Sequence, residues 1–213
     1  MLNNDLALKC KELLEKGEKN ISDQRKSILD EIALYMHTEI KKNNGEKELK
    51  VVYLCTHNSR RSHFAQVWGH IAALYFGIEN IKVFSGGTVA TACHPNTIGA
   101  LRHIGFNIVC RDLNVENPNY HVHYNSNEYI ECYSKANTDT SIPQTDFMAV
   151  MTCSDADENC PLVPGAQKRF STTYDDPKEF DDTSNPIPHY VERSLQIASE
   201  ILYTFQKLHQ LFN

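Results

Sequence analysis

The residues best suited to chemistry lie in the segment CTHNSRRS, at positions 55–62. A short loop before a helix points several backbone N–H groups inward and can cradle an anion, and its positive field favours a cysteine thiolate. Cys55 is therefore the expected nucleophile, Arg61 can bind two oxygens of the anion, and Ser62 can hydrogen-bond the thiolate. The loop predicts attack on a tetrahedral oxyanion, phosphate or arsenate, bound by Thr56, His57, Asn58, Ser59, Arg60 and Arg61.

The motif YDDP at 174–177 supplies a candidate proton donor. A thiolate that attacks a tetrahedral oxyanion needs an acid for the departing oxygen, and Asp-Pro favours a turn from which a carboxyl group could reach the anion. The motif offers two carboxylates, Asp175 and Asp176. Taken alone, the motif fits an ordinary surface turn better.

The segment CSDADENC joins Cys153 to Cys160 and follows a buried apolar run, so Cys153 is expected at the same sheet edge as Cys55. The separation covers about two helical turns, too far for a disulfide unless the segment changes conformation. The two residues are a candidate redox pair on a moving segment. The plainer alternative is one buried and one surface cysteine, and the spacing does not fit a zinc knuckle.

Other residues of chemical interest receive no site assignment. His121 and His123 share one face of a predicted strand but lack a third ligand, so no metal site is predicted. Four further cysteines are expected to be small buried residues, namely Cys10, Cys93, Cys110 and Cys132.

The elements around these motifs alternate between strands and helices. Apolar runs predict buried strands, and helical periodicity separates them. This order predicts an α/β fold with a parallel sheet, whose ligands bind beyond the carboxyl ends of the strands. Strands are expected at 49–55, 80–87 and 147–153, helices at 62–77, 95–104 and about 189–212, a hairpin within 114–145, and a polar stretch after Pro161 and Pro164.

The first part of the chain, residues 1–47, is predicted to be a helical extension, and residues 48–213 the catalytic domain. One helix is expected at 5–16, and Ser22 is suited to cap a second. Residues 41–48 have the composition of a linker. We expect the extension to pack on the main domain rather than to bind a partner.

The composition is that of an ordinary globular protein. The 213 residues carry a formal net charge of −6, which disfavours nucleic acid and anionic membranes as partners. No apolar run approaches a transmembrane helix, and the N-terminus lacks the apolar part of a secretory signal. We expect a cytoplasmic protein, in which seven cysteines point to catalytic or redox use rather than to structural disulfides.

Residues from about 49 to 210 resemble the low-molecular-weight protein tyrosine phosphatase superfamily, and within it the thioredoxin-coupled arsenate reductases. CTHNSRRS, CSDADENCPLVPG and YDDP carry the resemblance, with SGG at 85–87 as a small-residue turn. The resemblance implies a four-stranded parallel sheet flanked by helices. Residues 1–47 and roughly 114–145 fall outside it.

The resemblance also implies a thiol relay. Cys55 attacks arsenate, and Asp176 protonates the departing oxygen. Cys153 then forms a disulfide with Cys55 and releases arsenite. Cys160 next attacks Cys153, which leaves a Cys153–Cys160 disulfide for thioredoxin, the expected external reductant. No bound cofactor is expected.

The sequence departs from these relatives at the anion loop and at the acid motif. His57 stands where glycine is usual, and Arg60 where a second cysteine is common. Lys178 and Glu179 replace the aromatic residues that line a phosphotyrosine pocket in the phosphatases. Two alternatives are a tyrosine phosphatase that hydrolyses phosphoprotein monoesters with Cys55, Arg61 and Asp176 alone, and a non-catalytic oxyanion-binding module.

Overall fold

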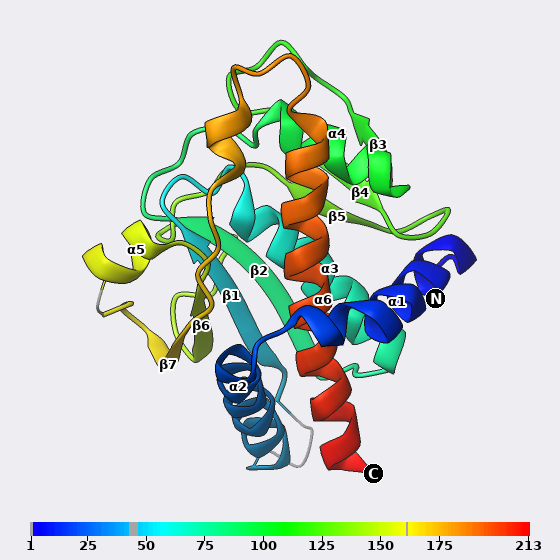
Figure 1. The fold of residues 1–213 in the computed structure, drawn as a ribbon. Helices are drawn as coiled ribbons and strands as arrows, with labels where there is room; N and C mark the ends of the chain where they lie inside the picture. Colours follow the sequence, from blue (N-terminus) through cyan, green and yellow to red (C-terminus); the bar gives the residue numbers. More distant parts are fainter. Residues whose placement is uncertain (1, 43–46, 161) are drawn as a thin grey trace.

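The structure is a computed structural model that describes residues 2–42, 47–160 and 162–213 (Figure 1). Residues 43–46 of the predicted linker, and Pro161 of the third cysteine motif, lie outside the described residues.

The main sheet has four parallel strands, as predicted. Its order is β2-β1-β6-β7. The strands are β1 (Leu49–Cys55), β2 (Ile81–Gly87), β6 (Phe147–Met151) and β7 (Ala166–Ser171). The expected bounds of β1 are confirmed to the residue, because its continuous apolar run is that of a strand buried on both faces.

The residue pattern did not predict β7, which falls in the stretch taken as polar. The strand lies at the edge of the sheet, and only Phe170 of its six residues is buried. An edge strand of this kind has no apolar run, so its sequence AQKRFS reads as a loop.

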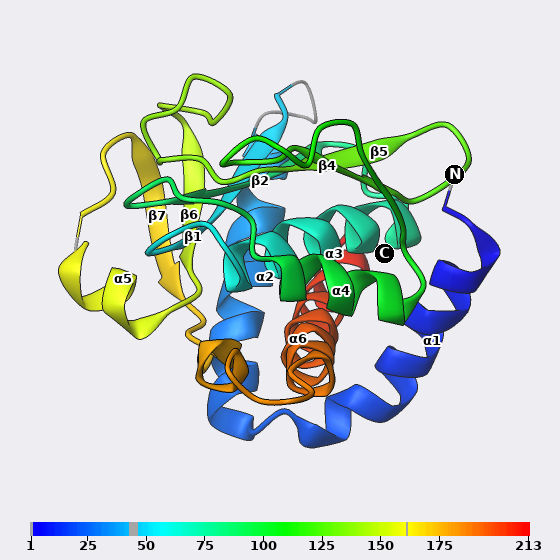
Figure 2. The ribbon, with the colours of Figure 1, turned by 90° about the horizontal axis from the view of Figure 1, so that it is seen from above.

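Alternate residues of β1 face two different cores, as the two-residue period of a strand requires. Val51 and Tyr53 join a large core with the helices, whereas Val52 and Leu54 join a smaller core. The larger core includes α3 (Arg61–Phe76), α4 (Pro95–Ile104) and α6 (Ile187–Phe212). Figure 2 shows α6 enclosed by the other long helices.

A second, antiparallel sheet lies next to α4. It consists of β3 (Asn107–Cys110), β4 (Tyr120–His123) and β5 (Tyr129–Cys132). The hairpin expected within 114–145 is β4–β5, and β3 was not predicted. The chain after β5 runs back along β2, where Gly87 and Ala136 form a parallel bridge. The insertion therefore passes beside the Cys55 loop, where the Lys135 N–H donates to the Asn58 side chain.

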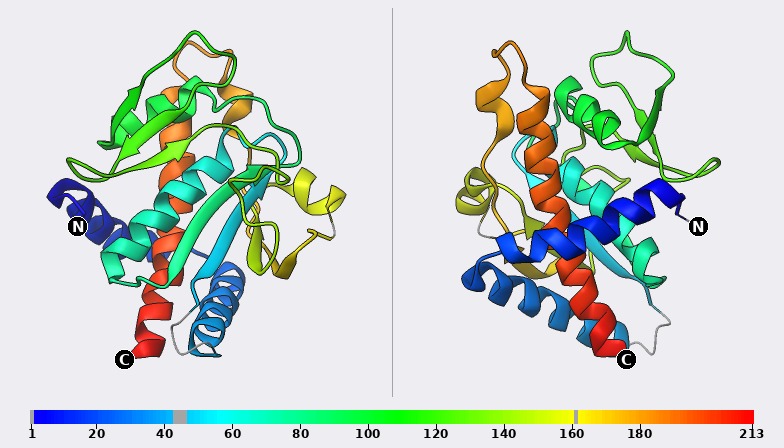
Figure 3. Two further views of the ribbon diagram at one scale, coloured as in Figure 1. Left: turned by 180° about the vertical axis from the view of Figure 1, so that it is seen from behind. Right: turned by 45° about the vertical axis from the view of Figure 1, so that its right-hand side comes forward.

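The first two helices, α1 (Asn4–Gly17) and α2 (Asp23–Lys42), pack against α6. Figure 3 shows α1 lying across α6. Ser22 caps α2 as predicted, since its hydroxyl accepts a hydrogen bond from the Arg25 N–H. Both helices contribute to the large core. The division into an extension of residues 1–47 and a catalytic domain of residues 48–213 stays a prediction.

Candidate active site

Cys55 is the last residue of β1, and its thiol is buried at the mouth of the loop that leads to α3. Its Sγ lies 3.0 Å from the Ser62 hydroxyl, and the Asn58 side-chain amide donates to the same hydroxyl at 2.8 Å. Because the Ser62 oxygen already accepts from Asn58, its hydrogen is free to point at the sulfur. This arrangement stabilises a thiolate.

The loop carbonyls are bound on the outside of the loop. Those of Thr56, His57 and Ser59 accept hydrogen bonds from the Val89 N–H at 2.9 Å, the Ser134 hydroxyl at 2.8 Å and the His94 N–H at 3.0 Å. In the described part of the chain, the N–H groups of residues 56–60 donate no hydrogen bond. Asn58 and Ser59 are buried, and buried N–H groups are rarely left without an acceptor, so these donors are suited to an oxyanion.

Two local features hold the loop in this shape. Asn58 has a φ of 44°, a left-handed conformation that asparagine tolerates, and its side-chain oxygen accepts from the Lys135 N–H at 2.8 Å. A Cβ on Gly87 would lie 2.7 Å from the Asn58 nitrogen and 2.8 Å from the Thr56 oxygen. The SGG motif forms the end of β2 rather than a turn after it, and Gly87 is needed there for the close approach of β2 to the loop.

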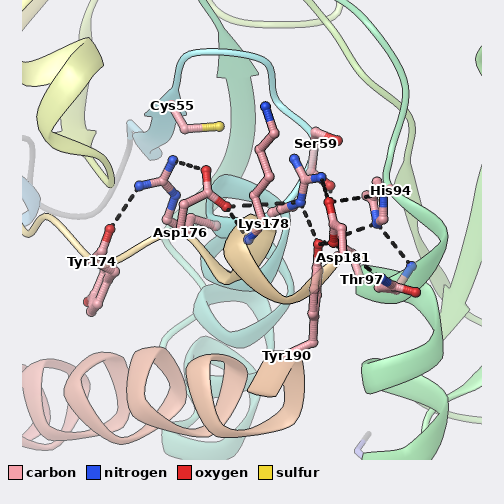
Figure 4. Close-up of polar contacts among 12 residues, drawn as sticks. Cys55, Ser59, His94, Thr97, Tyr174, Asp176, Lys178, Asp181 and Tyr190 are labelled. Atoms are coloured by element: carbon pink, nitrogen blue, oxygen red, sulfur yellow. Dashed lines mark hydrogen bonds and ion pairs between the residues drawn. The ribbon is translucent and has the colours of Figure 1, made fainter. Parts of the chain in front are cut away.

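Arg61 connects the loop to the YDDP motif. Its guanidinium donates to the Tyr174 carbonyl at 2.8 Å and to the Asp176 carboxylate at 2.5 Å, as Figure 4 shows. The other oxygen of Asp176 caps a short 3₁₀ helix, η2 (Pro177–Phe180), by accepting from the Lys178 N–H. In the same figure, the Lys178 side chain extends from η2 towards the loop.

The two carboxylates of the motif have different surroundings. The Asp176 side chain is 34% exposed and faces Arg61. The Asp175 side chain is 87% exposed and pairs at 3.3 Å with Arg193 on α6. Both carboxylates line the cleft beside the loop, but it is Asp176 that bonds to the loop arginine.

The side chain of Arg60 turns away from Cys55. It donates to the Tyr190 hydroxyl at 2.6 Å and pairs with Asp181, so only its backbone N–H remains available to an oxyanion. Burial opposes its charge, but the bond to Tyr190 and the carboxylates of Asp176 and Asp181 outweigh burial and raise the pKa of Arg60.

Sequence reasoning missed the cluster around Arg60. Asp181 also accepts from the Asn96 side chain at 3.2 Å, and its carboxylate lies 3.6 Å from the His94 ring. Burial raises the pKa of Asp181, but the Tyr190 hydroxyl and the charge of Arg60 outweigh it, so the net shift is downward. No local pattern signals such a cluster, because contacts such as Asn96–Asp181 and Arg60–Tyr190 join residues 85 and 130 positions apart.

Cys153 lies beside the anion loop, because β6 pairs with β1. It precedes α5 (Ser154–Asn159), and its Sγ accepts from the Ala156 N–H at 3.4 Å. The Thr56 hydroxyl lies 3.4 Å from the same sulfur and donates to Asp155 at 2.5 Å. Thr56 thus joins the loop directly to the second cysteine motif.

Cys160 follows α5 and is partly buried. Arg169 on β7 donates to its carbonyl at 3.2 Å and to the Asp157 carbonyl at 2.6 Å, which holds the end of the helix. A cleft of about 500 Å³ opens between α5 and the YDDP motif, and Arg61, Asp155 and Asp176 are among its lining residues.

The other residues singled out by the sequence lie elsewhere. Cys10, Cys93 and Cys132 are buried and Cys110 is partly exposed, and all seven cysteines are free. His121 stacks on Tyr129 with ring centroids 4.0 Å apart. Among the described residues, no group of three or more histidine, cysteine or acidic side chains could hold a metal ion, and no helix is long and apolar enough to cross a membrane.

Proteins of known name resemble this chain over most of their length. Arsenate reductase 2 of Staphylococcus epidermidis is 31% identical over 127 residues, which cover 60% of this chain and 77% of that protein. The arsenate reductase of Bacillus subtilis is 31% identical over 137 residues, which cover 64% and 80%. The chain belongs to the arsenate reductase family. No protein-family model matches it.

A solved structure agrees with the fold of this arsenate reductase family member. A mutant of YwlE from Bacillus subtilis superposes with a TM-score of 0.50 and 15% identity, covering 78% of this chain and 100% of that one. At that identity the likeness concerns the fold alone. The predicted resemblance to arsenate reductases is confirmed, and the chain is an enzyme of that family.

Proposed function

We propose that the protein is a thiol-dependent arsenate reductase that uses Cys55, Cys153 and Cys160 in turn. The observation that carries the proposal is the position of Cys153, whose sulfur lies 3.4 Å from the hydroxyl of Thr56, the residue after the nucleophile. A hydrolytic phosphatase has no use for a second thiol at this point.

The first half of the reaction is substitution at arsenic. The Cys55 thiolate, held by Ser62, attacks arsenate bound by the loop N–H groups and by Arg61. Asp176 gives its proton to the departing oxygen, which leaves as water. Arg61 must release Asp176, which it contacts at 2.5 Å, before it can bind the anion. Asp176 must then move from the guanidinium to the leaving oxygen.

The second half is a two-electron transfer. The Cys153 thiolate attacks the Cys55 sulfur, the sulfur–arsenic bond breaks, and its electron pair leaves with arsenic as arsenite. Cys160 then attacks Cys153, which releases Cys55 as a thiolate and forms the Cys153–Cys160 disulfide. An external dithiol protein of the thioredoxin class reduces that disulfide and restores the enzyme.

The alternative, a tyrosine phosphatase, shares the first half of this mechanism. The anion loop alone does not separate arsenate from phosphate, since both are tetrahedral oxyanions. Lys178 and Glu179, both exposed, put charge where an aromatic wall would be needed for phosphotyrosine. Slow hydrolysis of aryl phosphates is therefore expected beside reduction of arsenate. A non-catalytic module is disfavoured by the retention of nucleophile, arginine, serine and acid.

The test is arsenate-dependent NADPH oxidation in the presence of thioredoxin and thioredoxin reductase. Wild-type protein should turn over repeatedly, and Cys55→Ser should be inactive. Cys160→Ser should stop after a single turnover and should still hydrolyse an aryl phosphate. Cys110→Ser is the matched control, because that partly exposed cysteine lies on β3, and it should behave as wild type. Repeated turnover by Cys160→Ser would remove the relay from the mechanism.

A further inference from the structure

An arginine of the N-terminal helices reaches the segment that carries Asp176. Arg25 lies in the first turn of α2, ahead of the residues 49–210 in which the sequence motifs predict the family resemblance. Its guanidinium donates to the Thr173 carbonyl at 2.6 Å and lies over the ring of Tyr174, 5.1 Å from the centroid. The same group pairs at 3.2 Å with Glu200 of α6.

Tyr174 is held from three further sides. Its hydroxyl donates to Glu200 at 2.9 Å, its N–H donates to the Thr152 carbonyl at 3.2 Å, and its own carbonyl accepts from Arg61. The ring is buried. One residue therefore bonds to the α6 carboxylate through its side chain and to the anion-binding arginine through its backbone.

Arg61 connects Tyr174 to Asp176. One nitrogen of its guanidinium holds the Tyr174 carbonyl and another holds the Asp176 carboxylate, and Figure 4 shows both residues on the same side of the Cys55 loop. A shift of Tyr174 would move the anchor of Arg61 and the backbone two residues before the carboxylate.

Glu200 explains why an arginine is needed on α2. Its side chain is 6% exposed, and burial raises the pKa of this carboxyl, against which Arg25 and the Tyr174 hydroxyl act. A buried carboxylate must be paired and hydrogen-bonded, and the planar fork of arginine can serve Glu200 and the Thr173 carbonyl together. A lysine in the same place has one ammonium group for two partners.

We propose that Arg25 is a positioning residue for proton transfer: through Thr173, Tyr174 and Glu200 it fixes the backbone segment from which Asp176, once released from Arg61, reaches the departing oxygen. The N-terminal helices then have a part in the reaction besides packing. The inference rests on the proposed role of Asp176 as proton donor. It does not depend on whether arsenate or a phosphate ester is the substrate.

The test compares two aryl phosphates that differ in their need for an acid. Dinitrophenolate leaves without protonation, whereas phenolate requires a proton. Arg25→Gln should lower kcat at least about ten-fold on phenyl phosphate and less than about two-fold on dinitrophenyl phosphate, because misplacing the acid affects only the first. Asp176→Asn should give the same pattern more strongly, and Arg25→Lys and Tyr174→Phe should lie between wild type and Arg25→Gln.

Lys26→Gln is the matched control, since the adjacent Lys26 pairs at 3.7 Å with Glu18 and does not touch the acid segment. Lys26→Gln should lower kcat on neither aryl phosphate. A second measurement, amide hydrogen exchange of residues 172–176, should be faster in Arg25→Gln than in wild type while β1 keeps its protection. This measurement still tests the proposal if Arg25→Gln lowers the melting temperature of the protein, because exchange is compared between residues 172–176 and β1.

Two results would overturn the proposal. One is an equal loss on both substrates by folded Arg25→Gln and Arg25→Lys, and the other is unchanged exchange of residues 172–176. A failure of the proposed acid role of Asp176 would give a different result. If Asp176→Asn itself has no leaving-group dependence, Asp176 is not the acid, and the exchange data alone then decide whether Arg25 fixes the segment.

Discussion

At the scale of single residues, two neighbouring aspartates illustrate how surroundings separate chemical roles. Asp176 contacts Arg61, and its second oxygen caps η2. Asp175 is largely exposed and pairs with Arg193. Ion pairs of exposed side chains contribute ~0.2–1 kcal/mol, so the Asp175 pair adds little to the geometry of the site.

We expect Asp176→Asn to lower kcat for phenyl phosphate by about 100-fold, the lower end of the usual contribution of a general acid. Asparagine keeps the oxygen that caps η2, so the loss reports the missing proton rather than a distorted loop. Asp175→Asn should stay within about two-fold of wild type because its carboxylate is exposed. Steady-state kinetics of both variants decide the assignment, and the reverse ranking would transfer the acid role to Asp175.

At the scale of elements, α5 is the part of the site that must change shape. Cys153 and Cys160 flank its six residues, and a helix rises ~1.5 Å per residue, so the two Cα atoms are separated by roughly 10 Å along the axis. A disulfide requires about 7 Å or less. Only Ala156 of α5 is buried, and such a short helix is marginal, so unwinding costs little core packing.

Oxidation should therefore unwind α5. After one equivalent of arsenate without a reductant, residues 154–159 should exchange their amide hydrogens faster, while β1 and α3 keep their protection. Cys160→Ser should show no such increase, because its reaction ends at the Cys55–Cys153 disulfide. Retained protection of α5 in protein that mass spectrometry shows to contain the Cys153–Cys160 disulfide would contradict this prediction.

At the scale of the whole molecule, a buried histidine links the stability of the fold to pH. His63 in the first turn of α3 is fully buried, and its Nε2 has no hydrogen-bond partner among the described residues. Burial, with the charge of Lys135 acting in the same direction, lowers its pKa from 6.5 to about 3. Between those values an unfolded chain binds a proton at His63 that the folded protein does not.

Stability should accordingly fall as the pH drops from 6.5 towards 3, with a contribution from His63 of up to about 1.4 kcal/mol per pH unit. In His63→Gln the free energy of unfolding should change less steeply with pH, whatever the stability of the variant at neutral pH. His103→Gln, at an exposed position of α4, is the control and should keep the wild-type slope. Urea unfolding at several pH values tests this, and an unchanged slope for His63→Gln would contradict it.

Local features of the sequence were enough to predict the elements that position the nucleophile. The apolar run 49–55 gave the bounds of β1, and Pro95 together with the helical period gave those of α4. Ser22 capped α2 as expected. These signals lie in consecutive residues, because a buried strand, a cap and a helix face are defined by neighbours along the chain. The order of the three motifs likewise identified the family from the sequence.

Tertiary structure alone decided which distant side chains meet. The edge strand β7 exposes most of its residues and has no local signature. The guanidinium of Arg60 pairs with Asp181, 121 residues away. Arg25 contacts Thr173 across 148 residues. The choice of such partners depends on how α2, α6 and the sheet pack, and packing is a property of the whole chain that no window of neighbouring residues contains.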